Sequence, residues 1–314
     1  MLTIARLFTL LSLVCVVTLA PASAQIEAPA LDYVAVPDDF SLPPGMSFGS
    51  TSGVAINSKG NIFVLARGPN PLMEFDPAGK FIRGFGDGFF DRPHGLRIDA
   101  QDNIWTTDVA SHVAYKMSPQ GRILLVLGSK GSAGEFHPYG HLRFLNEPND
   151  IAVAPNGEIY IVQGHGRAPP AVLKFDRDGN FIKAWGKKGK GPGEFDIAHS
   201  VAIDAKGLVY VADRNNQRIQ VFDADGAFVR ESRYPGTPCG LFITPDQTLW
   251  LAHGHAGQVL KLDLDGKVLG AMGKQGRGLG QFGEAHFIAV SARNEIFVAD
   301  TLNWRVQKFV KIAP

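Results

Sequence analysis

The chain is poor in cysteine, with only two among its 314 residues. Cys15 lies in an apolar stretch near the N-terminus, so removal of that stretch would leave only Cys239, and no intramolecular disulfide could form. Neither sign of charge is in excess, with 31 lysines and arginines against 30 aspartates and glutamates. This balance provides no basic footprint for nucleic acid and no polybasic patch for a membrane surface.

The chain also lacks an apolar run of membrane-spanning length. The run from Leu7 to Leu19 follows Arg6 and leads to the small residues Ala22-Ser23-Ala24, a pattern typical of signal-peptidase cleavage before Gln25. We therefore predict a signal peptide over residues 1–24, no membrane span after its cleavage, and a periplasmic or secreted protein. Export without disulfides fits a bacterial periplasm, because a large core makes such bridges unnecessary.

What the sequence does contain is an internal repeat. Each unit opens with a similar apolar strand, passes through a short turn into a second strand, and in several cases reaches an Asp-Gly pair, which is a strong hairpin signal. A spacing of roughly 40–55 residues is typical of propeller blades. The sequence therefore predicts an all-β, six-bladed β-propeller with four antiparallel strands in each blade. The six units begin at Thr51, Pro93, Pro148, Ala198, Pro238 and Ala285.

The sixth unit ends near Lys311 without a fourth strand. An alternating apolar stretch from Leu31 to Val36 can supply this strand and close the ring, which removes exposed sheet edges. We therefore divide the chain into the signal peptide, an N-terminal segment over residues 25–47 with the ring-closing strand, and the propeller over residues 48–314. Three glycine-rich segments recur between blades without a following helix, so we interpret them as crossover loops and not as phosphate cradles.

The residue that opens the innermost strand of each blade faces the mouth of the central channel. Histidine fills this position in alternate blades, which lie about 120° apart in a six-fold ring, so their side chains converge on one point. Three imidazoles with an open fourth position form the ligand set of a catalytic zinc site. We predict that His94, His199 and His286 bind a metal, with zinc favoured, although imidazole also serves iron and manganese. The six residues are, in order, Ser52, His94, Asn149, His199, Cys239 and His286.

Two arginines lie just after the second strands, at matching positions of the first and fourth blades. A guanidinium group can bind a carboxylate through two hydrogen bonds, so Arg67 and Arg214 suit an anionic substrate above the metal. His165 follows a strand end directly, and we predict it to be an acid–base group. Asp213 and Asp300 occupy the repeat position just before that of the two arginines, and they are expected to tie down turns.

These residues resemble the peptidyl-α-hydroxyglycine α-amidating lyase family, in which a six-bladed propeller of NHL repeats carries three axial zinc-binding histidines. The resemblance implies that His94, His199 and His286 bind zinc, and that Arg67 and Arg214 hold the carboxylate and hydroxyl of the substrate. The family reaction removes glyoxylate from a peptide ending in α-hydroxyglycine and leaves a C-terminal amide. The metal lowers the pKa of the substrate hydroxyl and a tyrosine acts as the base.

The sequence departs from the family pattern at two positions. The family tyrosine follows an Asp-Gly pair, whereas here Gln163-Gly164 is followed by His165, which becomes the candidate base alongside a metal-bound hydroxide. The family also has a structural calcium, held by two backbone carbonyls and by an aspartate just after the last zinc-binding histidine. Phe287 stands at the aspartate position, so the sequence does not favour calcium.

The leading hypothesis is an exported, zinc-dependent lyase that acts on an α-hydroxylated carboxylate, either a small molecule or a peptide. A second hypothesis is a non-catalytic NHL-repeat propeller that binds a small ligand or a protein partner. A third is a lactonase-like hydrolase, but such propellers hold an axial calcium with Glu, Asp and Asn, and only Asn149 fits that pattern.

Overall fold

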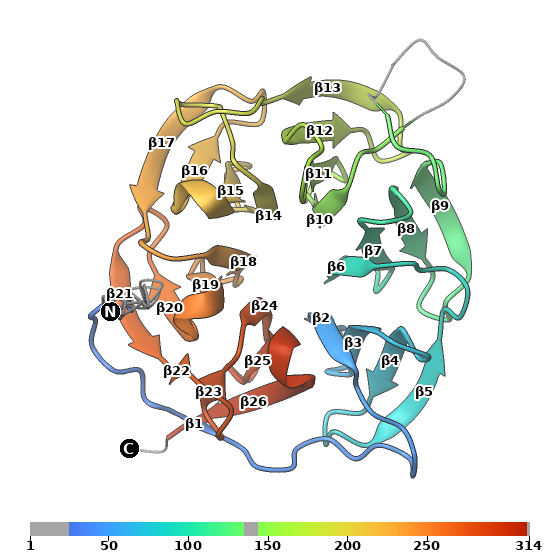
Figure 1. Ribbon diagram of the computed structural model, residues 1–314, viewed down its shortest axis with the longest axis vertical. Coiled ribbons are helices and arrows are strands. Elements are labelled where there is room, and N and C mark those ends of the chain that lie inside the picture. The colour runs from blue at the N-terminus through green and yellow to red at the C-terminus, as the bar shows by residue number, and fades with distance from the viewer. Residues whose placement is uncertain (1–24, 135–143, 313–314) are drawn as a thin grey trace, which may run out of the picture.

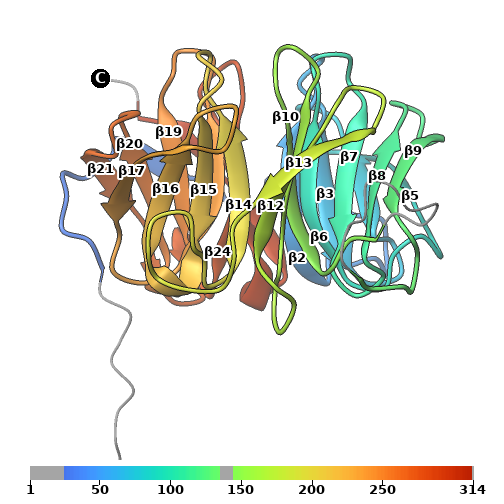
Figure 2. The same cartoon turned by 90° about the horizontal axis from the view of Figure 1, so that it is seen from above.

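The computed structural model describes residues 25–134 and 144–312. These residues form six four-stranded antiparallel sheets around a central axis, which confirms the predicted six-bladed propeller (Figures 1 and 2). The proposed signal peptide lies outside the described residues. No helix within the described ranges is long and apolar enough to cross a membrane.

Each blade runs outward from an innermost strand, and the blades follow one another in chain order (Figure 1). Blade 1 contains β2 (Ser50–Ile56), β3 (Ile62–Arg67), β4 (Leu72–Phe75) and β5 (Phe81–Phe85). Blade 2 contains β6 (Pro93–Ile98), β7 (Ile104–Asp108), β8 (Val113–Met117) and β9 (Ile123–Gly128). Blade 3 contains β10 (Pro148–Val153), β11 (Ile159–Gln163), β12 (Ala171–Phe175) and β13 (Phe181–Trp185).

The other three blades repeat this order. Blade 4 contains β14 (Ala198–Ile203), β15 (Val209–Asp213), β16 (Arg218–Phe222) and β17 (Phe228–Arg233). Blade 5 contains β18 (Pro238–Ile243), β19 (Leu249–His253), β20 (Gln258–Leu262) and β21 (Val268–Met272). Blade 6 contains β24 (Ala285–Val290), β25 (Ile296–Asp300), β26 (Arg305–Lys311) and β1 (Tyr33–Ala35). A short ladder joins β22 (Lys274–Gln275) to β23 (Gln281–Phe282), and the 3-10 helices are η1 (Arg214–Asn216), η2 (Gly254–Ala256) and η3 (Thr301–Asn303).

The N-terminal segment closes the ring, as the sequence predicts. Strand β1 pairs antiparallel with β26, with Val34 opposite Val310. The same segment contacts blade 5 through the Ala30–Ala271 bridge and blade 1 through the Ser41–Lys80 bridge, so it runs along the outside of three blades (Figure 1). Because β1 fills the outer edge of blade 6, the first and last parts of the chain complete one sheet.

The hydrophobic core is divided among the interfaces between blades. Six clusters of buried side chains each join two neighbouring blades, including the cluster of blades 6 and 1 that contains Phe297 and Val64. Burying one large apolar side chain contributes about 1.5–3 kcal/mol, so each interface holds its pair of blades firmly. The channel-facing residues at the axis are therefore positioned by a rigid ring.

The glycine-rich segments are structural crossovers, in agreement with the sequence interpretation. Arg218 is buried and donates to the backbone carbonyls of Lys190, Gly191 and Glu194. Carbonyl oxygens that face an arginine cannot form an anion cradle, which needs N–H groups. Phe195 and Phe282 at the ends of two crossovers are fully buried between neighbouring blades, in the clusters of blades 3 and 4 and of blades 5 and 6.

Candidate metal centre on the propeller axis

The six axial residues sit at irregularities of the innermost strands. In every blade the pairing of the innermost with the second strand shifts register at this residue, and a bulge of this kind re-aims the side chain it contains. All six are buried, with exposed fractions of 2 % or less. The repeat therefore sends one side chain from each blade to the axis.

The three axial histidines share one hydrogen-bonding pattern. Nδ1 of each ring lies against the backbone carbonyl of the axial residue in the next blade: His94 to Asn149 at 2.8 Å, His199 to Cys239 at 3.0 Å, and His286 to Ser52 at 2.7 Å. A carbonyl oxygen only accepts, so Nδ1 must carry the proton and Nε2 must be the acceptor. A histidine that binds metal through Nε2 is commonly oriented in this way.

The three rings converge on one another. The ring centroid of His94 lies 4.7 Å from that of His286 and 4.8 Å from that of His199, and the remaining pair is 5.0 Å apart. Nε2 of His94 and of His199 is buried and has no hydrogen-bond partner among the described residues. Burying a polar nitrogen without a partner costs free energy, and one metal ion would be a partner for both of these nitrogens.

Electrostatics keep these imidazoles neutral. Burial lowers the pKa of all three histidines well below the usual value. For His94 the neighbouring His165 lowers the pKa further, and for His199 the charge of Arg214 does so. Neutral imidazole is the form that binds a metal, so the residues present fit a cation with nitrogen ligands.

His165 joins this cluster from the bend after β11. Its ring lies 4.7 Å from His94 and 5.8 Å from His199, and the ligand atoms of these three residues lie within 4.8 Å of one another. His94, His165 and His199 are therefore able to hold a metal. His286 is not in that set of atoms, although its ring packs against both axial neighbours. The sequence places His165 near the site but gives no register from which its closeness to His94 could be predicted.

His165 itself is half-buried and neutral. The pKa of His165 is lowered to about 3, chiefly by burial and then by the charges of Arg214, Arg92 and Arg67. The effect of three arginines on one ring shows that positive charge gathers on this side of the cluster. Arg92 was not among the residues selected from the sequence, because it precedes the strand and has no repeat-matched partner.

The two predicted arginines lie at the same end of the blades as the axial histidines. Arg67 is the last residue of β3, and its Nε lies 3.4 Å from the carbonyl of Pro93, the residue before His94. Arg214 begins η1, and its backbone N–H donates to Ile197, two residues before His199. Both are half-buried, and neither forms an ion pair with a carboxylate of residues 25–134 or 144–312. We name this end of the propeller the arginine face.

The carboxylates at the ends of the second strands hold the fold together. Asp213 accepts hydrogen bonds from the backbone of Asp196 and from Arg218, and Asp300 accepts from the backbone of Gly283 and from Arg305. The expectation that these aspartates tie down turns is confirmed. His253 has the equivalent place in blade 5, where both ring nitrogens are buried without a hydrogen-bond partner among the described residues.

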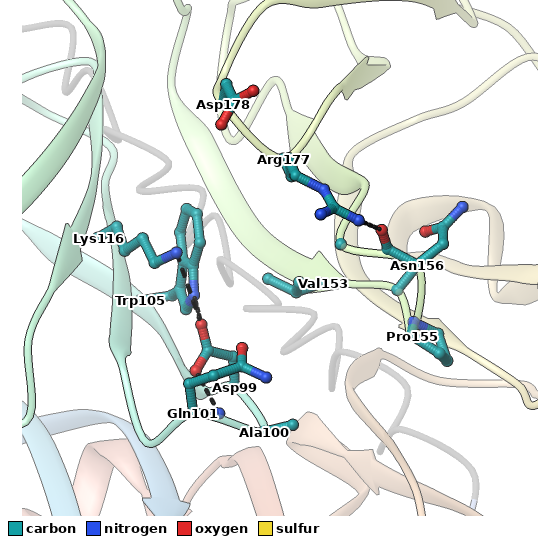
Figure 3. A pocket seen from close by; sticks show the side chains of 12 residues that line it. Asp99, Ala100, Gln101, Trp105, Lys116, Val153, Pro155, Asn156, Arg177 and Asp178 are labelled. Carbon is teal, nitrogen blue, oxygen red and sulfur yellow. Dashed lines mark hydrogen bonds and ion pairs between the residues drawn. The ribbon is translucent and has the colours of Figure 1, made fainter.

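A cavity of about 610 Å³ lies between blades 2 and 3, lined by Asp99, Trp105, Lys116, Arg177 and others (Figure 3). It lies at the turn between β6 and β7, the opposite end of the blade from His94. Asp99 accepts from Trp105 and Arg177 donates to the carbonyl of Asn156 (Figure 3). Asp99 also accepts from Asn103. The side chains of Asp99 and Arg177 in this cavity are thus bonded within the fold.

Fold and axis together define a six-bladed β-propeller of NHL-type repeats with a histidine cluster at the arginine face. A family model described as a 6-bladed β-propeller matches residues 145–257. The chain resembles the peptidyl-α-hydroxyglycine α-amidating lyases, as its sequence motifs suggest. It is 31 % identical over 279 residues to peptidyl-alpha-hydroxyglycine alpha-amidating lyase 1 of Drosophila melanogaster, which covers 78 % of this chain and 50 % of the relative.

Other relatives differ in what their names describe. NHL repeat-containing protein 3 of Mus musculus is 37 % identical over 188 residues, covering 56 % of this chain and 53 % of that protein. The chain thus spans about half the length of these curated relatives. Among solved structures, a streptogramin B lyase matches with 14 % identity and a TM-score of 0.60. The match covers 88 % of this chain and 97 % of the lyase chain. A gluconolactonase from Xanthomonas campestris covers 92 % of this chain and 98 % of its own at 17 % identity and a TM-score of 0.61. At these identities the two structures show the shared fold alone.

Proposed function

We propose that this protein is a zinc-dependent lyase that cleaves an α-hydroxylated, carboxylate-bearing substrate of the peptidyl-α-hydroxyglycine type and releases glyoxylate. The observation that carries this proposal is the convergence of His94, His199 and His286 as neutral rings, each fixed through Nδ1, beside two arginines that pair with no carboxylate in the described part of the chain. The similarity to amidating lyases supports it.

The three axial histidines would hold the metal through Nε2, with His165 closing one side of the site. When bound, a zinc ion would supply Lewis-acid chemistry that lowers the pKa of the substrate hydroxyl. The fixed tautomers mean that the imidazoles need no reorganisation to bind it.

Arg67 and Arg214 would bind and orient the substrate carboxylate. Because both guanidinium groups are half-buried and carry no paired carboxylate within the described residues, an anion between them gains more than it would at an exposed site. Holding the carboxylate at this face would set the adjacent hydroxyl-bearing carbon over the histidine cluster.

His165 would accept the proton that the substrate hydroxyl loses. As the carbon–oxygen bond becomes a carbonyl, the carbon–nitrogen bond breaks and its electron pair goes to nitrogen, which takes up a proton. The products are glyoxylate and a primary amide. Neutral His165 has one ring nitrogen free of a proton, but its pKa of about 3 makes it a weak base until the bound carboxylate offsets the charges of the neighbouring arginines.

The decisive experiment measures zinc content and glyoxylate release for the mature protein beside His199→Ala. We expect about one zinc per chain and turnover of an α-hydroxyglycine peptide, with both lost in the variant. His255→Ala, which changes an exposed histidine of η2, is the matched control. A wild type that binds no transition metal when zinc is supplied would contradict the proposal.

A second function is favoured by one observation, the 37 % identity to NHL repeat-containing protein 3. In that case the propeller would bind a small ligand or a protein partner without catalysis. Zinc bound by wild-type protein, with no glyoxylate released from any α-hydroxyglycine peptide offered, would favour this function.

A further inference from the structure

A group of side chains fills the channel next to the axial histidines, one to three residues further along the innermost strands. We call it the axial plug and define it as Arg97, Asp150, Ser200 and Phe287. They come from blades 2, 3, 4 and 6, so the plug joins four of the six blades. Asp150 and Ser200 have no exposed surface, and Phe287 is 1 % exposed.

The carboxylate of Asp150 has all of its acceptor capacity in use. Arg97 binds it with both arms of its fork, Nε at 3.1 Å from Oδ1 and Nη2 at 2.5 Å from Oδ2. The hydroxyl of Ser200 donates to Oδ2 at 2.7 Å, and the backbone N–H of Val201 donates at 3.1 Å. The backbone N–H of Ile151 donates to Oδ1 at 2.9 Å. With five donors on two oxygens, this carboxylate offers no lone pair to a metal ion.

Phe287 separates this ion pair from the histidines. Its ring stacks on His199 with centroids 5.9 Å apart and meets His286 edge-on at 4.9 Å. The guanidinium carbon of Arg97 also lies 5.4 Å from the centroid of the Phe287 ring. The residue after the last axial histidine therefore brings an aromatic ring, and with it a fixed positive charge, to the axis.

A calcium ion does not fit this environment. The resemblance to amidating lyases implies an aspartate at position 287 as a calcium ligand, and here the side chain at that position, Phe287, has no oxygen. Hard cations take six to eight oxygen ligands. The nearby carboxylate is saturated, and the adjacent guanidinium would repel a divalent cation.

We infer that the axial plug replaces a structural calcium: the guanidinium of Arg97, paired with Asp150, lies at the axis against Phe287, so this propeller needs no calcium ion there. The role is structural and does not rest on the proposed lyase activity. Arg97 stabilises the ring of blades through its contacts with Asp150, Ser200 and the aromatic ring of Phe287.

The first test is the calcium dependence of the wild-type protein. Calcium is removed with a chelator, zinc is restored, and thermal unfolding is followed with and without about 5 mM calcium, a concentration above the Kd of weak extracellular sites. We expect no calcium in the purified protein by mass spectrometry and no change in Tm. One calcium per chain, or a rise in Tm of several degrees, would overturn the inference.

The second test asks whether calcium can take the place of the missing guanidinium. Arg97→Ala leaves Asp150 buried and unpaired, so we expect Tm to fall by about 5–10 °C. Calcium should recover part of this loss, because a cation can then neutralise the carboxylate. Arg218→Ala is the matched control, since it strips a buried arginine from the carboxylate of Asp213 away from the axis. If calcium raises the Tm of Arg97→Ala no more than that of the control, the axial charge replacement is wrong.

A double substitution keeps the test decisive if Arg97→Ala unfolds. Arg97→Met with Asp150→Leu removes both charges, and we expect its Tm to exceed that of Arg97→Met alone. A double variant that is no more stable than the single one would show that the pair does not act as a unit.

Discussion

Nδ1 of His286 in blade 6 lies 2.7 Å from the backbone carbonyl of Ser52 in blade 1. The contact that orients one axial imidazole therefore spans the junction at which the ring closes. Thr301 donates to the carbonyl of Thr51 at the same junction, at 2.6 Å. If His286 binds the proposed metal, metal binding and closure of the propeller are linked through this same pair of blades.

This link predicts that zinc stabilises the folded protein. With free zinc 100-fold above its Kd, stability should rise by about 2.7 kcal/mol, seen as a higher Tm. His286→Ala should abolish the increase, because the ligand at the closing junction is gone. The exposed His255→Ala should retain the increase. An equal shift in His286→Ala and wild type would show that zinc binds elsewhere.

The arginine face predicts a loss of substrate affinity on removal of one guanidinium. Arg214→Ala should lower kcat/KM about 10- to 100-fold, since a hydrogen bond to a charged group contributes about 1.5–3 kcal/mol. Zinc content should stay unchanged. Arg177→Ala, which changes a residue of the cavity at the opposite end of the blades, should leave kcat/KM as in wild type. An unchanged KM for Arg214→Ala with a carboxylate-bearing substrate would contradict the assigned role.

Variants of His165 and His286 are expected to differ in metal content. If the axial three hold the zinc, His286→Ala loses it, whereas His165→Gln keeps it and loses turnover. The readout is zinc per chain measured beside kcat for each variant. Loss of zinc from His165→Gln with retention in His286→Ala would assign the metal to His94, His165 and His199 instead.

Acid should destabilise the protein through His253. Burial lowers the pKa of His253 to about 4, below its ordinary value of 6.5. The folded state therefore resists protonation while the unfolded state accepts a proton, so stability is full above pH 6.5 and falls as the pH drops toward 4. Between these two pH values, His253 alone changes the free energy of unfolding by about 1.4 kcal/mol per pH unit. Urea unfolding of His253→Gln across this range should show a shallower slope than wild type, and equal slopes would contradict it.

Export remains a prediction of the sequence. If residues 1–24 are a signal peptide, N-terminal sequencing of protein from a bacterial periplasmic extract should begin at Gln25. A protein that retains Met1 and stays in the cytoplasm would contradict it.

The repeat made the fold predictable from the sequence. Strand positions, the ring-closing segment and the axial register all follow from local patterns that recur in each blade, such as Ala198-His199 and Ala285-His286. The closeness of His165 to His94 could not be predicted, because a bend after a strand has no register to fix its direction. The pair of Arg97 and Asp150 was also missed, since it crosses between blades and depends on the reach of a long side chain.

The bulges at the axis have a consequence for variation. In blades 1, 3 and 5 the axial residue orients a neighbouring imidazole through its carbonyl oxygen, an atom that every amino acid possesses. The side chains of Ser52, Asn149 and Cys239 are therefore not what aligns the three rings. A different side chain at these three buried positions would therefore change the shape of the axial channel but would keep the backbone contact that orients each imidazole.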